Sequence, residues 1–489
     1  MNLKKESEAR LKEPQKSSHN YFITMVTVLF SIVFLATGGL IIFGPAHPDW
    51  TFWGLFRIKG FTLLIWGVVS LFSALISGYS SNYLQGFKYQ SRFAGLCLGF
   101  TLSVMTMVAG DQVVALLISW FSMGFFMSRL IGVELDWPEA RAASRYAQRF
   151  FIWSSGMLIT GVLLLSFSTE KFTLSGIMPA LSSLPTTVLF ASALFIIIAC
   201  LIQSAIYPFH RWLLSAMTAP TPASALMHAG FVNGSGILLT IFASLIVHAQ
   251  VLSLLFVVGS LTALAAQFTK LLQISVKQKL ACSTIAQMGF MIMQCGLGFF
   301  NAAVTHLILH GFYKAYLFLS SGENIKASVP EKAMPIFIRP FQALVVILSG
   351  IIGAALFALL TGKGTMMDSG IFLTLVVAIT VGQATYNILK QSVLSLVQKL
   401  LLPLLLFPAG IGSYALVYSG VSNIIKDIPF VEVPSPVSMV QLLFGVVFLL
   451  GFFIMKLELY KKFPWLYVKL LNLSQPYHKT ILTHKNKSI

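Results

Sequence analysis

The chain has 489 residues, of which 57% are hydrophobic and only 10% are charged, and its formal net charge is +18. A soluble domain has about 25% charged residues, so this composition excludes soluble enzymes and soluble nucleic-acid-binding proteins. An excess of Lys and Arg on cytoplasmic loops is the alternative source of the positive charge, and we expect no nucleic-acid partner.

Apolar runs of about 20 residues, the length that a bilayer core requires, recur along most of the chain. They predict an all-α membrane protein with about fourteen transmembrane helices between a polar N-terminal tail, residues 1–20, and a basic C-terminal tail, residues 458–489. The transmembrane domain is residues 21–457. The expected spans lie near 21–43, 60–80, 92–109, 112–132, 150–168, 186–207, 224–248, 250–272, 279–299, 301–320, 341–361, 370–390, 400–420 and 437–457.

The distribution of basic residues predicts the orientation of these spans. With the N-terminus inside and the spans alternating, 27 of the 33 Lys and Arg residues fall on inside segments and five on outside segments. Such a bias is what the positive-inside rule requires, so we expect both termini in the cytoplasm of a bacterial cell whose inner membrane holds the chain. The remaining basic residue, Lys314, lies within a span, whereas all 15 Asp and Glu residues fall in tails, loops or span edges.

Cysteine spacing and glycine motifs give no sign of a cofactor. The four cysteines lie in apolar segments without metal-ligand spacing, and no dinucleotide-binding glycine fingerprint, phosphate-binding loop or haem-attachment motif occurs. We therefore expect neither a metal site nor a redox cofactor in this chain.

The segment between the sixth and seventh spans departs from a plain helical pattern because Pro208, Pro220 and Pro222 interrupt it. Interrupted helices at membrane depth occur where they are buried in protein or line a water-filled cavity, and they often mark a transport site. An ordinary cytoplasmic loop with proline turns is the alternative.

The tenth span carries the strongest candidate site: His306, His310 and Lys314, which are spaced by four. At about 100° per residue they share one helix face roughly 12 Å long. A lysine near the bilayer centre costs about 3 kcal/mol or more, which favours an orientation toward a partner or water. Imidazole and amine groups can both relay protons. The alternative is a lysine that snorkels to the interface and two packing histidines.

Further polar residues could extend this face into a proton or ion pathway. They are His228 after the proline break, Gln203 before it, Lys277 and Gln287 on the ninth span and its edge, and Lys390 at the cytoplasmic end of the twelfth. Each also has a structural explanation, as a hydrogen-bonded core residue, a helix contact or a marker of the inside face.

Three sequence motifs follow one another between residues 204 and 319. The first is Ser204-Ala205-x-x-Pro208-x-His210-x-Trp212-Leu213-x-x-Ala216-Met217-x-x-Pro220-Thr221-Pro222-x-Ser224-Ala225-Leu226-x-His228. The second and third are Lys277-x-x-Leu280-Ala281-x-Ser283-Thr284-x-x-Gln287-x-Gly289 and His306-Leu307-x-x-His310-x-Phe312-x-Lys314-Ala315-x-x-Phe318-Leu319. Together they resemble the proton-conducting subunits of NADH:quinone oxidoreductase and of Mrp antiporters. The resemblance implies two inverted five-helix repeats with broken helices, and a hydrated axis that includes Lys277, His306, His310 and Lys314.

Two departures from this family concern its charged pair. The family usually has Trp-Glu where this chain has Trp120-Phe121, and a lysine where it has Gln203. Both members of the Glu–Lys pair are therefore replaced by uncharged residues, which disfavours a standard pumping subunit of NADH:quinone oxidoreductase.

The chain is most similar to the membrane subunits of DAB inorganic-carbon accumulation complexes, the DabB type. That resemblance implies a subunit that moves protons or Na⁺ and energises a soluble DabA-type partner on the cytoplasmic face, whose zinc site is like that of a carbonic anhydrase. Catalysis would then belong to the partner. The alternatives are a subunit of an Mrp antiporter, hydrogenase or NADH:quinone oxidoreductase complex, and a non-conducting membrane anchor.

Overall fold

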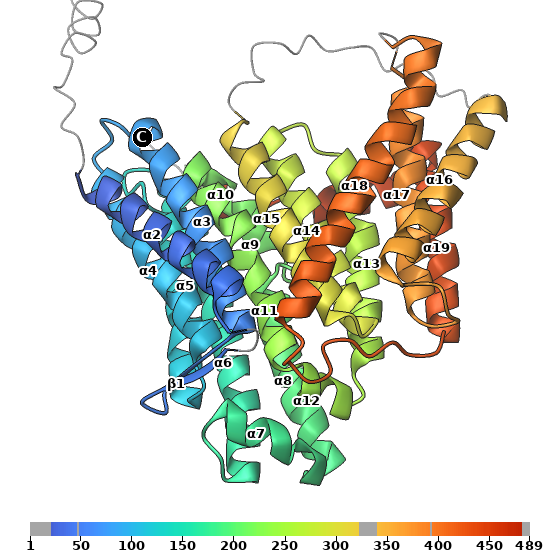
Figure 1. The fold of residues 1–489 in the computed structure, drawn as a ribbon. Helices are drawn as coiled ribbons and strands as arrows, with labels where there is room; N and C mark the ends of the chain where they lie inside the picture. The colour runs from blue at the N-terminus through green and yellow to red at the C-terminus, as the bar shows by residue number, and fades with distance from the viewer. Residues whose placement is uncertain (1–20, 46–47, 322–339, 392–393, 482–489) are drawn as a thin grey trace, which may run out of the picture.

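The computed structural model describes residues 21–45, 48–321, 340–391 and 394–481, and in these ranges the chain is almost entirely helical (Figure 1). The predicted tail 1–20 and the end of the C-terminal tail, 482–489, lie outside the described residues. The helices are α2 (Tyr21–Phe43), α3 (Gly60–Tyr83), α4 (Gln90–Ala109), α5 (Val113–Ile131), α6 (Pro138–Thr169), α7 (Leu174–Ala180), α8 (Thr186–Gln203), α9 (Arg211–Ser215), α10 (Thr221–Ala229), α11 (Gly234–Ile241), α12 (Ala243–His248), α13 (Leu252–Leu271), α14 (Val276–Gly296), α15 (Phe300–Leu319), α16 (Pro340–Thr361), α17 (Gly370–Leu389), α18 (Leu396–Ile424), α19 (Met439–Lys456) and α20 (Pro464–Leu473).

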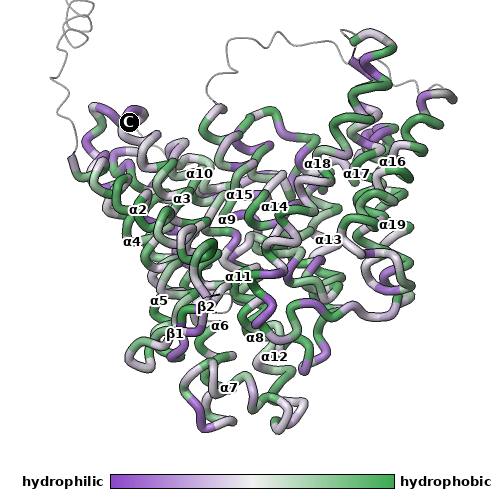
Figure 2. Tube along the Cα trace, viewed as in Figure 1, coloured by the Kyte–Doolittle hydropathy of each residue, from purple (hydrophilic) through white to green (hydrophobic). Residues whose placement is uncertain are grey.

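The all-helical membrane fold predicted from the sequence is confirmed. Twelve stretches of helix in the described residues are long and apolar enough to cross a membrane, and in α2, α16, α18 and α19 only 17% of the apolar window is buried inside the protein, as lipid contact requires. Figure 2 shows hydrophobic residues along the helices and hydrophilic residues gathered at helix ends and loops. The expected ninth and tenth spans correspond to α14 and α15, which fall outside this set of twelve because they contain the polar candidate residues. The count of fourteen spans and the inverted repeats stay predictions.

The first residue of α2 and the C-terminal segment lie on one face of the bundle, here called the termini-bearing face (Figure 1). The opposite face holds a β-hairpin made by β1 (Asp49–Phe52) and β2 (Phe56–Lys59). Its turn uses Trp53 and Gly54, both with positive φ, which a tight hairpin needs to match the twist of its strands. Arg57 binds Asp49 across the hairpin at 2.6 Å, and this hydrogen bond lowers the pKa of the Asp49 carboxyl.

The hydrophobic core has two parts. The larger runs through α2 to α15, and the smaller lies where α13, α14 and α15 meet α16 to α19. Helices α2 to α15 are here called the larger helix group, and α16 to α19 the smaller helix group. Close helix contact at this junction depends on glycine. A Cβ atom added at Gly259, Gly289 or Gly296 would collide with backbone atoms of the facing helix in the α13–α14 pair, so only glycine permits this approach.

The predicted interruption between the sixth and seventh spans is present. α8 ends at Gln203, and the chain then forms the short α9 and a 3₁₀ turn (Ala216–Thr218) before α10 begins. A second 3₁₀ turn (Phe231–Asn233) separates α10 from α11. These pieces are buried almost throughout, which contradicts the alternative of an ordinary surface loop.

The segment after α19 forms an ordered strap across the termini-bearing face. It consists of a 3₁₀ turn (Leu459–Lys462), α20 and a second 3₁₀ turn (His478–Thr480), and it contacts α13 and then α6. The strap therefore links the smaller helix group to the larger one.

The predicted orientation can be tested with two single cysteines, because Cys97, Cys200, Cys282 and Cys295 are all buried. Trp53 in the hairpin and Ile274 between α13 and α14 are almost fully exposed on opposite faces. We expect an impermeant maleimide to label Trp53→Cys in intact cells and Ile274→Cys only after the membrane is permeabilised. The reverse pattern would contradict the positive-inside assignment.

Candidate ion pathway

Side chains bind backbone carbonyls in and beside the interrupted segment. Trp212 Nε1 donates to the Ile202 carbonyl at 2.8 Å, and Ser204 Oγ donates to the Val232 carbonyl at 2.7 Å. Lys277 Nζ, from the first turn of α14, donates to the Ala219 carbonyl at 2.8 Å. An ammonium group is thereby fixed against the break.

Lys314 is fully buried at the centre of the bundle. Its Nζ donates to the Leu280 carbonyl at 3.1 Å, and none of the described carboxylates forms an ion pair with it. The predicted alternative of snorkelling is wrong, because a snorkelling lysine places its ammonium group in the aqueous interface. The Lys314 amine instead has hydrogen-bonding capacity left over in the protein interior.

The two histidines of the same helix face also lie inside the protein. The rings of His306 and His310 are nearly parallel, with centroids 6.0 Å apart, and His306 packs edge-on against Phe290. His310 is 5% exposed, and neither of its ring nitrogens has a hydrogen-bond partner among the described residues. Buried polar atoms normally have partners, so these two nitrogens are exceptions that a structural role in packing does not explain.

His228 comes from α10 to the same region. Its ring stacks on Phe318 of α15 with centroids 4.4 Å apart, and both of its nitrogens also lack partners among the described residues. The charges of Lys314 and Lys277 act on it directly, as the charge of Lys314 acts on His310. The structure therefore places His228 and His310 within reach of the charge of Lys314, and His228 within reach of Lys277, with His306 next along the α15 face.

The positions of the replaced Glu–Lys pair differ from each other in their surroundings. Phe121 is exposed on the surface of α5, whereas Trp120 is buried and donates from Nε1 to Ser154 Oγ at 3.1 Å. Gln203 is buried at the end of α8, and its Nε2 has no partner among the described residues.

Gln287 and Lys390 lie on the side of the smaller helix group. Gln287 lines a cavity of about 490 Å³ between α13, α14, α17, α18 and α19, which Gln267, Lys270 and Gln383 also line. The backbone of Gln287 interacts with His306, so this cavity adjoins the histidine face. Lys390 does not line the cavity and instead lies at the end of α17 with its ammonium over the Tyr386 ring, 5.3 Å from the centroid.

A polar cluster that sequence reasoning missed lies at the other end of α15. Asn301 Nδ2 donates to Glu432 Oε2 at 2.6 Å, and Glu432 Oε1 accepts from Lys363 Nζ at 2.8 Å. The Lys363 ammonium also lies over the rings of Phe299 and Tyr418, 3.7 and 4.8 Å from their centroids. These residues come from α15, α18 and three separate loops, so no local spacing predicts their contact. Only the unusual lysine beside an apolar run could have drawn attention to Lys363.

The Lys363–Glu432 pair is electrostatically unequal. Burial raises the pKa of Glu432, but hydrogen bonds from Lys363, Asn301 and Tyr418 and the charge of Lys363 outweigh it, and the pKa lies below its usual value. Burial lowers the pKa of Lys363, whose side chain is only 3% exposed against 40% for Glu432. The buried lysine therefore depends on the carboxylate more than the carboxylate depends on it.

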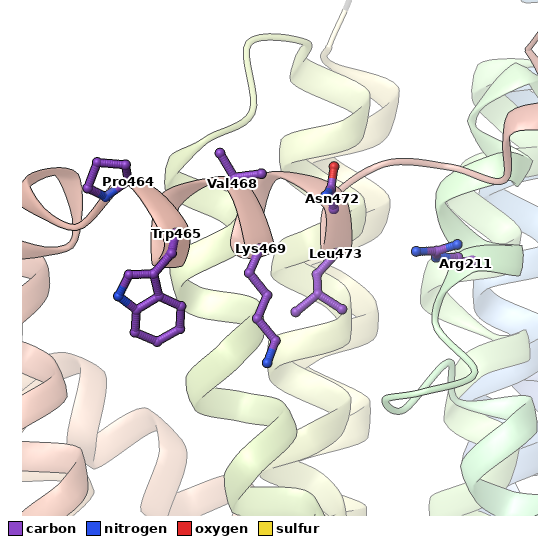
Figure 3. A pocket seen from close by; sticks show the side chains of 7 residues that line it. All are labelled: Arg211, Pro464, Trp465, Val468, Lys469, Asn472 and Leu473. Atoms are coloured by element: carbon purple, nitrogen blue, oxygen red, sulfur yellow. The ribbon is translucent and has the colours of Figure 1, made fainter.

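The strap reaches the interrupted segment at the termini-bearing face. His210 Nε2 lies 2.7 Å from the Leu473 carbonyl, and the Tyr477 amide donates to Ser215 Oγ at 3.0 Å. Figure 3 shows α20 running across the helices behind it, with Trp465 and Lys469 pointing down from it and Arg211 beyond its end. These three residues are part of the lining of a hollow of about 570 Å³.

Within the described ranges, no group of three or more His, Cys, Asp or Glu side chains is placed to hold a metal ion. The expectation that zinc belongs to a partner stays a prediction.

Comparison with protein families identifies residues 110–395 as matching the transmembrane family "NADH:quinone oxidoreductase/Mrp antiporter". The chain is 35% identical over 303 residues to the probable inorganic carbon transporter subunit DabB1 of Halothiobacillus neapolitanus, covering 59% of this chain and 54% of that protein. It is 32% identical over 361 residues to the probable inorganic carbon transporter subunit DabB of Bacillus subtilis, covering 72% and 68% of the two chains. The chain thus spans about half the length of several curated relatives that it matches.

Among solved structures, the chain is similar to the Mrp complex of Dietzia sp. DQ12-45-1b, with a TM-score of 0.63 and 21% identity. That match covers 92% of this chain and 55% of the other. At this identity the likeness concerns the fold alone.

The Lys363–Glu432 pair predicts the effect of removing one partner. Glu432→Gln leaves the buried Lys363 ammonium without its carboxylate, and we expect a loss of about 2–3 kcal/mol in stability at neutral pH, at or below the lower end of the range for fully buried pairs because Glu432 is 40% exposed. Thermal unfolding of the purified protein in detergent would measure it.

A matched double variant, Lys363→Met with Glu432→Gln, should recover most of that stability. Because the folded pKa of Glu432 is lowered, the contribution of the pair is present above the ordinary carboxyl pKa and is lost as the pH falls through the folded pKa. The difference between wild type and Glu432→Gln should therefore shrink in acid. A difference that persists unchanged would contradict the role of the pair.

Proposed function

The chain belongs to the NADH:quinone oxidoreductase/Mrp antiporter family of membrane proteins, and we propose that it is the ion-translocating membrane subunit of an inorganic-carbon accumulation complex. The substrate class rests on the similarity to DabB subunits of inorganic carbon transporters from Halothiobacillus and Bacillus. Protons are the ion that the candidate pathway suits best, because its central groups are imidazoles and amines.

The observation that supports conduction is the burial of Lys314 beside His228, His306 and His310 without a carboxylate partner among the described residues. Burying three imidazoles with unpartnered ring nitrogens costs free energy in a protein interior. Packing contacts alone do not offset that loss of hydrogen bonds with water. Intramembrane ionisable residues that face the bundle interior are typical of proton relays.

The proposed relay needs water between its members. Ring centroids 6.0 Å apart place His306 and His310 too far for direct hydrogen bonding in their stacked arrangement, so a bridging water would carry the proton from one imidazole to the next. The imidazole that receives a proton at one nitrogen releases one from the other. Lys314 and His228 continue the relay toward the break, and Asn301 and the Lys363–Glu432 pair lie beyond His306 toward the opposite face.

Partnership is the second part of the proposal. By similarity to DabB subunits, the ion flow would energise a soluble zinc-binding partner of the DabA type, like a carbonic anhydrase, on the cytoplasmic face. The strap is the element of this chain that such a partner would meet on the termini-bearing face. Its contacts with His210 and Ser215 would pass movement to the interrupted segment.

Two substitutions test the relay. Lys314→Met keeps the length and apolar stem of the side chain but removes the amine, and His310→Leu removes an imidazole. We expect each to reduce inorganic-carbon uptake that depends on the proton-motive force by roughly tenfold or more, since proton-transfer groups contribute at least that much. Expression and complex assembly should be preserved because a neutral side chain replaces a buried polar one.

Lys279→Met is the matched control, because Lys279 lies in the same helix as Lys277 but is exposed. It should keep wild-type uptake, and Gln203→Ala should have a milder effect than Lys314→Met because an amide cannot store a proton. Assembled Lys314→Met and His310→Leu variants with full, uncoupler-sensitive uptake would favour the non-conducting anchor.

Partnership is tested in a carbonic-anhydrase-deficient host. We expect this chain alone to leave the host unable to grow in air and co-expression with its soluble zinc partner to restore growth. Full rescue by this chain alone would contradict the proposal. Rescue of salt tolerance or of NADH oxidation instead would favour an Mrp or respiratory-complex subunit.

A further inference from the structure

The outer helices α16, α17 and α19 enclose an apolar groove of about 250 Å³ on the lipid-facing side of the smaller helix group. Its lining includes Val346 and Gly350 of α16, Ala378 and Gly382 of α17, and Phe452 of α19. Along each helix the lining spans two to three turns, so the groove is roughly 10–16 Å long and parallel to the helices. Ile347, Ile351 and Phe453 at its edges are exposed, so the groove opens toward the bilayer.

Two lysines lie at the end of this groove near the termini-bearing face. Lys456, the last residue of α19, has its Nζ 4.8 Å from the centroid of the Tyr386 ring, and Lys390, just after α17, has its Nζ 5.3 Å from the same centroid. The two ammonium groups are therefore at most about 10 Å apart and repel each other.

The charge of these lysines has no counterpart in the part of the chain that the structure describes. Lys456 Nζ donates to the neutral Asn387 Oδ1 at 3.0 Å, and no ion pair joins either lysine to a described carboxylate. Tyr386 lines the groove and is 6% exposed, and its buried hydroxyl has no hydrogen-bond partner among the described residues. Two cations, of which Lys456 lines the groove, thus lie near the ring of Tyr386, whose buried hydroxyl lacks a partner at the same end of the groove.

We propose that this groove binds an anionic phospholipid, with one acyl chain between α16, α17 and α19 and the headgroup phosphate held by Lys390, Lys456 and the Tyr386 hydroxyl. The phosphate supplies the negative charge and the acceptor that the three groups lack, and the acyl chain fills the groove below them. Basic pockets between transmembrane helices on the cytoplasmic side suit such headgroups. Lysines that only snorkel from helix ends need neither the groove nor the buried hydroxyl.

The site is tested on the full chain purified in mild detergent. Native mass spectrometry and thermal unfolding would compare added phosphatidylglycerol with phosphatidylcholine of the same acyl chains. We expect phosphatidylglycerol to be retained and to raise the unfolding temperature more than phosphatidylcholine. In the Lys390→Gln/Lys456→Gln double variant this preference should fall by roughly tenfold, since each lysine near a headgroup contributes to it.

Three controls separate the site from general effects. Lys88→Gln/Lys399→Gln removes the same charge from loops and helix ends elsewhere and should keep the preference. Ala343→Phe should block the groove near its mouth and reduce retention without changing any charge. Inorganic phosphate should not reproduce the stabilisation, because it lacks the acyl chain.

An equal response to both lipids, an equal loss in both double variants, or full stabilisation by inorganic phosphate would overturn the proposal. If the double variant does not fold, the single variants Lys390→Gln and Lys456→Gln provide the same comparison.

Discussion

The structure depends on one constraint: every backbone polar group at membrane depth must find a partner inside the protein. The chain is interrupted after α8, and the buried interruption is held by side chains that donate to backbone carbonyls in and beside it, those of Trp212, Ser204 and Lys277. Lys314 also lies inside the protein, and its Nζ donates to the Leu280 carbonyl of α14. Lys277 therefore both fixes the interrupted segment and belongs to the proposed pathway.

The buried cations are held without carboxylates over most of the molecule. Lys277 and Lys314 use carbonyls, and Lys456 uses an amide and a ring. The Lys363–Glu432 pair differs because a carboxylate at the protein surface neutralises the lysine. In the proposed relay, the positive charge of Lys277 and Lys314 near the centre would repel a second proton until the first has left. That arrangement would make transfer sequential.

The sequence predicted most of the helices because they are apolar runs of sufficient length, and it predicted the His306, His310 and Lys314 face because helical periodicity alone places them together. It missed the Lys363–Glu432 contact, since the two residues lie in different loops and meet only through tertiary packing. The tail after Lys456 was predicted only as basic. A ten-residue helix such as α20 is marginal by itself and is stabilised by contacts with α13 that no local pattern reveals.

The replaced Glu–Lys pair explains how the relay could differ from that of charged relatives. Trp120, the neighbour of Phe121, binds Ser154, whose hydroxyl donates to the Ala199 carbonyl at 2.9 Å, so neutral hydrogen bonds connect α5, α6 and α8 beside the replaced position. Gln203 keeps a polar group at the end of α8 but cannot accept and release a proton near neutral pH. Protons that cross would then have to join the relay at His228 or through the Gln287 cavity, both of which adjoin α15. The first half of the bundle would serve mainly to fix the interrupted segment, and the titratable groups on α15 would carry the transfer that the lost pair once shared.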